Sequence, residues 1–174
     1  MTEKQAVLFD TEDKSHWCKV GSDYELEFIE RFGKRVGARI NPEKEHNPYV
    51  ADLLLHGSLV GDLKTQTEPF WTADRYGFSP LSTVTLNGKD INRYKELYPD
   101  ITVFFWVRFA GGVKYNRSVP QMEAVYSMTL SQIMRMIDEN YSHRHYYQRR
   151  QDDHINAQYS YLFDTSMLLQ WFPR

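Results

Sequence analysis

Two carboxylates and a lysine within one apolar stretch constrain the fold more than any other feature of the chain. Residues 49–64 form two apolar segments, and they contain Asp52, Asp62 and Lys64. The segments are separated by His56-Gly57-Ser58, which is typical of a tight turn, so they are predicted to form a β-hairpin. Because side chains alternate along a strand, Asp62 and Lys64 share one face. An antiparallel pairing then sets Asp52 opposite the region of Asp62.

This arrangement indicates a cation site. Two acids that face each other on an apolar sheet repel, and a buried carboxylate is costly unless it is paired. Carboxylate oxygens suit Mg²⁺, which takes one or two of them together with waters and a substrate phosphate. The hairpin therefore predicts a site for Mg²⁺, or Mn²⁺, at Asp52 and Asp62. The structural alternative is a small-ligand α/β domain in which Asp52 and Lys64 form only a buried ion pair.

The spacing of these residues carries a family resemblance. Asp52, nine intervening residues, Asp62, Leu63 and Lys64 across a hairpin resemble the motif of the PD-(D/E)xK, restriction-endonuclease-like nucleases. In that superfamily the first acid lies at one strand, and the second acid and the lysine lie on the next. The resemblance implies that Asp52, Asp62 and the backbone carbonyl of Leu63 hold the metal, and that Lys64 positions the attacking water.

The motif departs from the commoner pattern at two positions. Ala51 rather than proline precedes the first acid, and the second acid, Asp62, is aspartate rather than glutamate. Gln66 continues the face of Asp62 and Lys64. Some members of the superfamily use a polar residue at that position, so the resemblance adds Gln66 to the catalytic candidates.

An amphipathic helix is predicted to precede the hairpin, from Ser22 to about Val36. Ser22 followed by Glu25 has the spacing of a capping box. The apolar positions of one face recur with the helical period: Phe28, Ile29, Phe32 and Val36. Two interpretations of Glu25 remain open. It completes the cap, or, as the resemblance implies, it points to the metal site as a further ligand and catalytic residue.

The rest of the pattern alternates between the two kinds of element. Strands are predicted over residues 83–86, 101–109 and 124–128, and helices over residues 90–98 and 129–140. Such an order is typical of an α/β fold, in which a mixed central β-sheet is flanked by helices. This is also the restriction-endonuclease-like core that the resemblance implies.

Length and composition indicate one domain over residues 1–174. The resemblance covers residues 22–140, and residues 141–174 form a C-terminal extension. The chain has 174 residues, of which 41% are hydrophobic, enough for a core of its own. It has no apolar run of about 20 residues, so no membrane partner is expected. The beginning of the chain lacks a signal-peptide pattern and the single cysteine, Cys18, cannot form an internal disulfide, so a cytoplasmic location is expected.

Nucleic-acid contacts must come from local groups, because the net charge is −2. Residues 68–80 are rich in aromatic side chains and follow the hairpin closely. Residues 141–151 mix arginine with tyrosine, which suits phosphate contact and base stacking. The candidates are Trp71, Arg75, Tyr76, Arg93, Arg144 and Arg149.

Two other interpretations of the C-terminal extension stay open. Residues 141–151 could be a solvated, irregular segment. His143, His145 and His154 could form a transition-metal group, but they lack the ligand spacing of known sites and are a weak signal.

The sequence therefore predicts a metal-dependent nuclease that acts on nucleic acid, with DNA favoured, and leaves endonuclease or exonuclease action open. A homodimer is possible, because many nucleases that cut both strands act as dimers. The alternative is a non-catalytic nucleic-acid-binding or assembly module on a nuclease-like fold.

Overall fold

The computed structural model describes residues 14–47, 49–147 and 158–172 of the chain. Its larger sheet has six strands in the order β1-β2-β3-β5-β6-β9. Their bounds are Ala38–Ile40, Leu53–Leu55, Val60–Gln66, Thr102–Lys114, Arg117–Thr129 and Leu169–Phe172. Every neighbouring pair is antiparallel except β3 and β5, which run parallel, so the sheet is mixed as the sequence predicts.

A smaller sheet has three antiparallel strands in the order β4-β8-β7. Their bounds are Thr83–Asn87, Tyr159–Asp164 and His143–Tyr146. The interpretation of residues 141–151 as irregular is wrong for β7. Its backbone is paired with β8, so its successive side chains point to opposite faces of the smaller sheet. Both β8 and β9 come from the C-terminal extension, and β9 joins the larger sheet.

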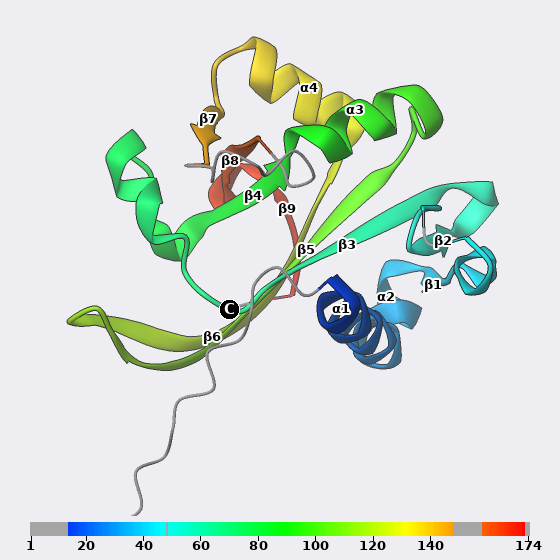
Figure 1. Cartoon of the computed structure of the whole chain (residues 1–174), viewed down its shortest axis with the longest axis horizontal. Coiled ribbons are helices and arrows are strands. Elements are labelled where there is room, and N and C mark those ends of the chain that lie inside the picture. Colours follow the sequence, from blue (N-terminus) through cyan, green and yellow to red (C-terminus); the bar gives the residue numbers. More distant parts are fainter. Residues whose placement is uncertain (1–13, 48, 148–157, 173–174) are drawn as a thin grey trace, which may run out of the picture.

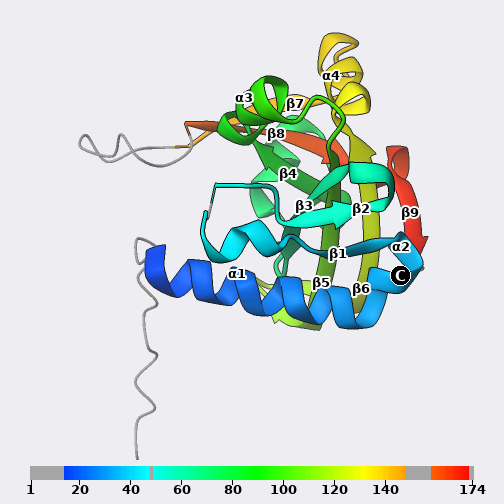
Figure 2. The same ribbon diagram turned by 90° about the vertical axis from the view of Figure 1, so that its right-hand side faces the viewer.

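The larger sheet is covered on both faces. Figures 1 and 2 show α1 (Lys14–Phe28) and α2 (Lys34–Val36) along one face. On the other face lie α3 (Gly88–Leu97), α4 (Leu130–Asp138) and the smaller sheet (Figure 1). The connection from β3 to β5 passes through β4 and α3, as a parallel pair requires a crossover. This confirms an α/β fold with helices on the faces of a mixed sheet.

Each covered face has its own hydrophobic core, and β5 separates the two. Its side chains at Phe104 and Trp106 pack toward Phe28 and Phe32 of the first helical segment. The alternate side chains of β5 pack into the core that contains residues of α3, α4 and β4. A strand buried on both faces explains why residues 101–109 are an almost unbroken apolar run.

The predicted hairpin is confirmed. β2 and β3 pair antiparallel, with Leu53 opposite Gly61, and a tight turn at His56–Ser58 joins them. Gly57 and Ser58 in this turn both have positive φ, at 69° and 67°, a left-handed conformation that glycine adopts without steric cost. Continuing the register by one pair sets Asp52 opposite Asp62, as the sequence predicts.

The predicted start of the first helix is wrong. α1 begins at Lys14, so Ser22 lies inside the helix and does not cap it. No proline interrupts the chain between Lys14 and Gly33, and the helix therefore extends upstream past the Ser-x-x-Glu signal. After Phe28 one π-helical turn (Ile29–Gly33) leads into α2, and Gly37 caps the C-terminus of α2 in the left-handed conformation.

The other predicted elements are confirmed. Thr129 caps α4 in a capping box with Gln132, and the predicted helix over residues 90–98 is α3. The strands over residues 101–109 and 124–128 are parts of β5 and β6, which continue into a long hairpin beyond the rest of the larger sheet (Figure 1). Among the described residues, no helix combines the length and apolar character needed to cross a membrane.

Candidate functional site

Asp62 and Lys64 lie on the face of β3 that is turned toward α3. Asp62 Oδ2 lies 2.7 Å from Lys64 Nζ. The helix adds Asp90, whose Oδ2 lies 2.9 Å from the same nitrogen, and Arg93, whose Nη2 lies 3.5 Å from Asp62 Oδ1. The Lys64 ammonium is therefore held between two carboxylates from different elements.

Opposite charges keep Asp62 and Lys64 ionised although burial opposes the charge of each. Asp62 is only 2% exposed, and burial acts to raise its pKa. Lys64 and the Tyr94 hydroxyl outweigh burial and hold the pKa of Asp62 below its usual value. Burial acts to lower the pKa of Lys64, but Asp62 and Asp90 hold it well above the usual value. Lys64 is therefore a cation and hydrogen-bond donor at working pH, and it is not a base.

Asp52 lies directly before β2 and faces the backbone of β3. Its Oδ2 accepts a hydrogen bond of 3.0 Å from the N–H of Leu63. The N–H and C=O of one strand residue point to the same side of the strand, so the Leu63 carbonyl also points toward β2, the side on which Asp52 lies. Burial and the nearby charge of Asp62 raise the pKa of Asp52. Asp62 is thus close enough to Asp52 for its charge to raise the pKa of Asp52.

The direct cationic partner of Asp52 is Lys44 and not Lys64. Lys44 Nζ lies 2.6 Å from Asp52 Oδ1 and 2.5 Å from Glu25 Oε2. The ion pair between Asp52 and Lys64 that the structural alternative requires is replaced by two pairs, Lys44 with Asp52 and Lys64 with Asp62. Glu25 turns toward this group from α1, although it does not complete a cap.

Glu25 is a carboxyl group whose pKa is strongly raised. Burial and the charge of Asp52 raise its pKa to about 7, against the opposing effect of Lys44. A carboxyl group that titrates near neutral pH, next to two further acids, is characteristic of functional sites, although structural networks produce it as well.

Asp52 and Asp62 are the two carboxylates of the hairpin that could hold a divalent ion. Asp62 Oδ2 is buried and, apart from its ion pair with Lys64, has no partner with hydrogen-bond geometry among the described residues. Asp52 stands across the hairpin from it. Mg²⁺ needs no more than one or two carboxylates, with waters completing its shell. No set of three or more His, Cys, Asp or Glu side chains is arranged to hold a metal within the described part of the chain.

A cavity of about 390 Å³ opens beside Lys64. Its wall includes Lys64, Gln66 and Asp90, and Phe70 borders it from the loop after β3. Gln66 shares the face of Lys64, and its Nε2 donates a 3.0 Å hydrogen bond to the carbonyl of Thr83. The cavity therefore gives a ligand access to Lys64 on the α3 side of the hairpin, whereas Asp52 and Asp62 do not line it.

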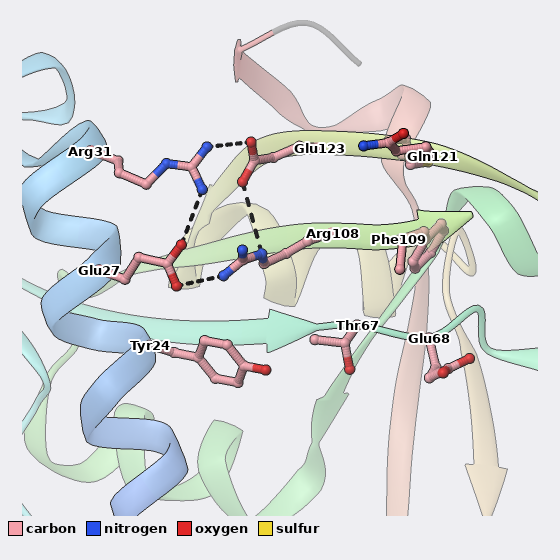
Figure 3. A pocket seen from close by; sticks show the side chains of 11 residues that line it. Tyr24, Glu27, Arg31, Thr67, Glu68, Arg108, Phe109, Gln121 and Glu123 are labelled. Atoms are coloured by element: carbon pink, nitrogen blue, oxygen red, sulfur yellow. Dashed lines mark hydrogen bonds and ion pairs between the residues drawn. The ribbon is translucent and has the colours of Figure 1, made fainter. Parts of the chain in front are cut away.

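A second, larger cavity of about 870 Å³ lies on the opposite face, beside α1 (Figure 3). Four of its side chains form a ring of alternating charge, in which Glu27 and Glu123 each contact both Arg31 and Arg108 (Figure 3). Because α1 contributes Glu27 and the π-helical turn contributes Arg31, the ring anchors this helical segment to β5 and β6. It thereby fixes the helix that presents Glu25 to Lys44.

The aromatic loop after β3 packs against other parts of the protein. The Trp71 ring meets Tyr115 of the β5–β6 turn edge to face, with ring centres 5.9 Å apart. The Tyr76 hydroxyl lies 2.9 Å from His145 Nδ1, whereas Arg75 is exposed. Trp71 and Tyr76 are half-buried, whereas Arg75 projects into solvent, and nucleic-acid contact by the three residues stays a prediction.

The remaining candidates for nucleic-acid contact are dispersed. Arg93 is inside the site, paired with Asp62 and Asp90. Arg144 is exposed on β7 and donates to the Tyr161 hydroxyl over 2.6 Å. Arg149 and His154 lie outside the described residues, so neither the contact at Arg149 nor the three-histidine group is tested.

Sequence reasoning missed Lys44, Asp90 and Tyr94. Lys44 sits in a polar connection with no motif around it, and Asp90 and Tyr94 looked like ordinary residues of a short amphipathic helix. The sequence offered one weak indication of these residues. Buried acids and a partly buried lysine need partners of opposite charge, and the segments before and after the hairpin contain such residues.

Comparison with known proteins gives little further information. No family model matches the chain, and no curated protein matches it. Among solved structures, the chain is similar to a nuclease from a fusselovirus, with 14% identity over 95% of this chain and 90% of that chain and a TM-score of 0.40. A likeness this distant carries no argument about function, which must rest on the geometry of the site.

Proposed function

We propose that the protein is a metal-dependent nuclease that hydrolyses phosphodiester bonds in nucleic acid, with DNA as its substrate. One observation carries the proposal: the β2–β3 hairpin sets Asp52 within range of the charge of Asp62, and Asp62 contacts Lys64, which lines a cavity of about 390 Å³. The choice of DNA rests on the resemblance of this motif to the PD-(D/E)xK nucleases.

Asp52, Asp62 and the Leu63 carbonyl would hold Mg²⁺ or Mn²⁺ at the hairpin. When bound, such an ion supplies a Lewis acid for the phosphate and lowers the pKa of a coordinated water. The Leu63 N–H orients the Asp52 carboxylate, and Tyr94 and Arg93 support that of Asp62.

Lys64 would stabilise the negative charge that develops on the phosphate. Its ammonium is fixed between Asp62 and Asp90, and it borders the cavity through which the scissile phosphate would approach. A donor that is already oriented costs no reorganisation during the reaction, and this is the main advantage of such a site. Gln66 lies farther along the same face and would contact the substrate.

A cleavage assay tests the proposal. Purified protein is incubated with labelled single-stranded and double-stranded DNA and RNA in Mg²⁺, Mn²⁺ or EDTA. We expect DNA products with either metal and none in EDTA, and loss of products in Asp62→Ala but not in Asp100→Ala, an exposed aspartate after α3. Binding of DNA without cleavage under all conditions would instead support the non-catalytic binding module.

A further inference from the structure

Lys44 occupies the place between two acids of the site. Its ammonium nitrogen lies 2.5 Å from Glu25 Oε2 and 2.6 Å from Asp52 Oδ1, and its side chain is 19% exposed. Glu25 comes from α1 and Asp52 directly precedes β2, so the ammonium joins two elements at a point where each contributes a carboxyl group. Two carboxylates repel each other when both are ionised, and the ammonium between them offsets that repulsion.

The segment that carries Lys44 is built to hold it there. Lys44 lies in a 3₁₀ turn, Pro42–Glu45, and the buried side chain of Asn41 caps that turn by accepting from the N–H of Glu43. Asn41 is also tied to the residues at the start of the hairpin. Its Nδ2 donates to the Ala51 carbonyl over 2.8 Å, and its backbone N–H donates to the Asp52 carbonyl over 2.9 Å. The turn is therefore fixed to the same backbone that positions the Asp52 carboxylate.

The pattern of charge divides the site into two halves. On the α3 side, Asp62 is paired with Lys64 and supported by Arg93. On the α1 side, Glu25 and Asp52 share Lys44 alone among the cations that contact them in the described structure. A divalent ion at Glu25 and Asp52 would lie against the ammonium, and like charges at that distance repel strongly in a buried site.

We infer that Lys44 is a resident cation that takes the position of a second metal, so that the site binds a single divalent ion, on the Asp62 side of Asp52. This inference rests on the proposed metal-dependent function. It makes Glu25 a residue that positions Lys44 and, through it, Asp52. A monovalent, covalently attached cation also keeps this half of the site charged when divalent ions are scarce.

The number of bound metal ions tests the inference. Mn²⁺ is titrated into the wild type, Lys44→Met, Lys44→Arg and Lys34→Met, and bound ions are counted by calorimetry and by electron paramagnetic resonance. Methionine keeps the length of the side chain without its charge, arginine keeps the charge, and Lys34 is an exposed lysine of α2 that serves as the control. We expect one ion per chain in wild type, Lys44→Arg and Lys34→Met, and two in Lys44→Met.

Loss of a buried cation could also unfold Lys44→Met, since an uncompensated pair of acids is strongly destabilising. Thermal unfolding with increasing Mn²⁺ covers that case. A second ion should stabilise this variant more than the wild type, because the ion binds only the folded state. Failure of Mn²⁺ to restore the folded state of the variant would overturn the inference.

The same samples are assayed for cleavage, which separates the two proposals. Two ions in the wild type, or one in folded Lys44→Met, with cleavage retained in the wild type would overturn the role of Lys44 and leave the nuclease standing. No Mn²⁺ binding by the wild type would overturn both.

Discussion

The backbone N–H of Leu63 donates a 3.0 Å hydrogen bond to Asp52 Oδ2. This bond makes the turn between β2 and β3 part of the site, because the register of the hairpin decides which backbone group Asp52 meets. A slip of one residue would move Asp62 and Lys64 to the opposite face of β3, away from α3. The spacing between Asp52 and Asp62 is therefore a property that the turn must preserve.

Loss of Asp62 or Lys64 should abolish cleavage. Asp62→Ala removes a proposed metal ligand, and Lys64→Ala removes the fixed positive charge proposed to face the phosphate, so each should lower the single-turnover rate by at least ~10²-fold. The rates are measured with saturating DNA, and circular dichroism reports whether each variant is folded. Folded variants with wild-type rates would rule out the proposed site, and Asp100→Ala serves as the matched control.

Asp52 should determine the affinity for the metal. Asp52→Asn keeps the shape of the side chain and removes its charge, so Mn²⁺ binding should weaken by about tenfold or more. Mg²⁺ and Mn²⁺ should support turnover better than Zn²⁺, because the proposed ligands are oxygens. Ca²⁺ should bind but give little product, since its geometry is looser. Equal Mn²⁺ affinity of wild type and Asp52→Asn in calorimetry would remove Asp52 from the metal site.

The hairpin was predictable because its determinants are local. Apolar runs, a Gly-Ser turn and the alternation of side chains are all contained within residues 49–64. Lys44 and Asp90 were not predictable in the same way. The contact of Lys44 with Glu25 depends on how a 3₁₀ turn meets α1, and that of Asp90 with Lys64 depends on a crossover between parallel strands. The periodicity of a sequence indicates whether a segment is a helix or a strand. It does not indicate which other elements that segment will contact in the folded protein.

The helix start was mispredicted for a related reason. Ser22 and Glu25 have the spacing of a cap, but an N-cap also needs a chain that is not helical before it. That condition fails here, because α1 already begins at Lys14. Glu25 therefore has no role in capping the helix, and its side chain contacts Lys44 instead.

Glu25 should make the folded protein less stable as the pH rises through the neutral range. Its pKa is raised from 4.5 to about 7, so the folded state holds the proton more tightly than the unfolded chain. The resulting stability is fully present below pH 4.5 and is lost as the pH rises to about 7. Glutamine cannot ionise, so the free energy of unfolding of Glu25→Gln should fall by roughly 2 kcal/mol less than that of the wild type over this pH range.

Urea unfolding at pH 5 and pH 8 in EDTA measures the effect. EDTA removes any bound ion, which would otherwise stabilise the charged form of the site. Glu30→Gln, an exposed glutamate of the π-helical turn, is the control and should follow the wild type. The same dependence on pH in wild type and Glu25→Gln would show that Glu25 ionises in the folded protein as it does in the unfolded chain.

Asp90 should act on the reaction through Lys64. Its Oδ2 lies 2.9 Å from Lys64 Nζ and its Oδ1 lies 3.4 Å from Arg93 Nη2, so it fixes the position of the ammonium relative to Asp62. Asp90→Asn keeps the size of the side chain but weakens its hold on the lysine. A misplaced donor lowers the rate of the chemical step, and we expect kcat to fall by roughly tenfold while KM for DNA changes little.

The split between kcat and KM distinguishes this positioning role from a role in substrate binding. If Asp90 contacted the DNA or the ion directly, its replacement would change KM or the dependence on Mg²⁺ as well. Asp90→Glu should recover part of kcat, because the charge is restored even though the carboxylate is displaced. Wild-type kcat in Asp90→Asn would mean that Asp62 alone holds Lys64 in place, and the second carboxylate would then serve only to anchor the start of α3 to the sheet.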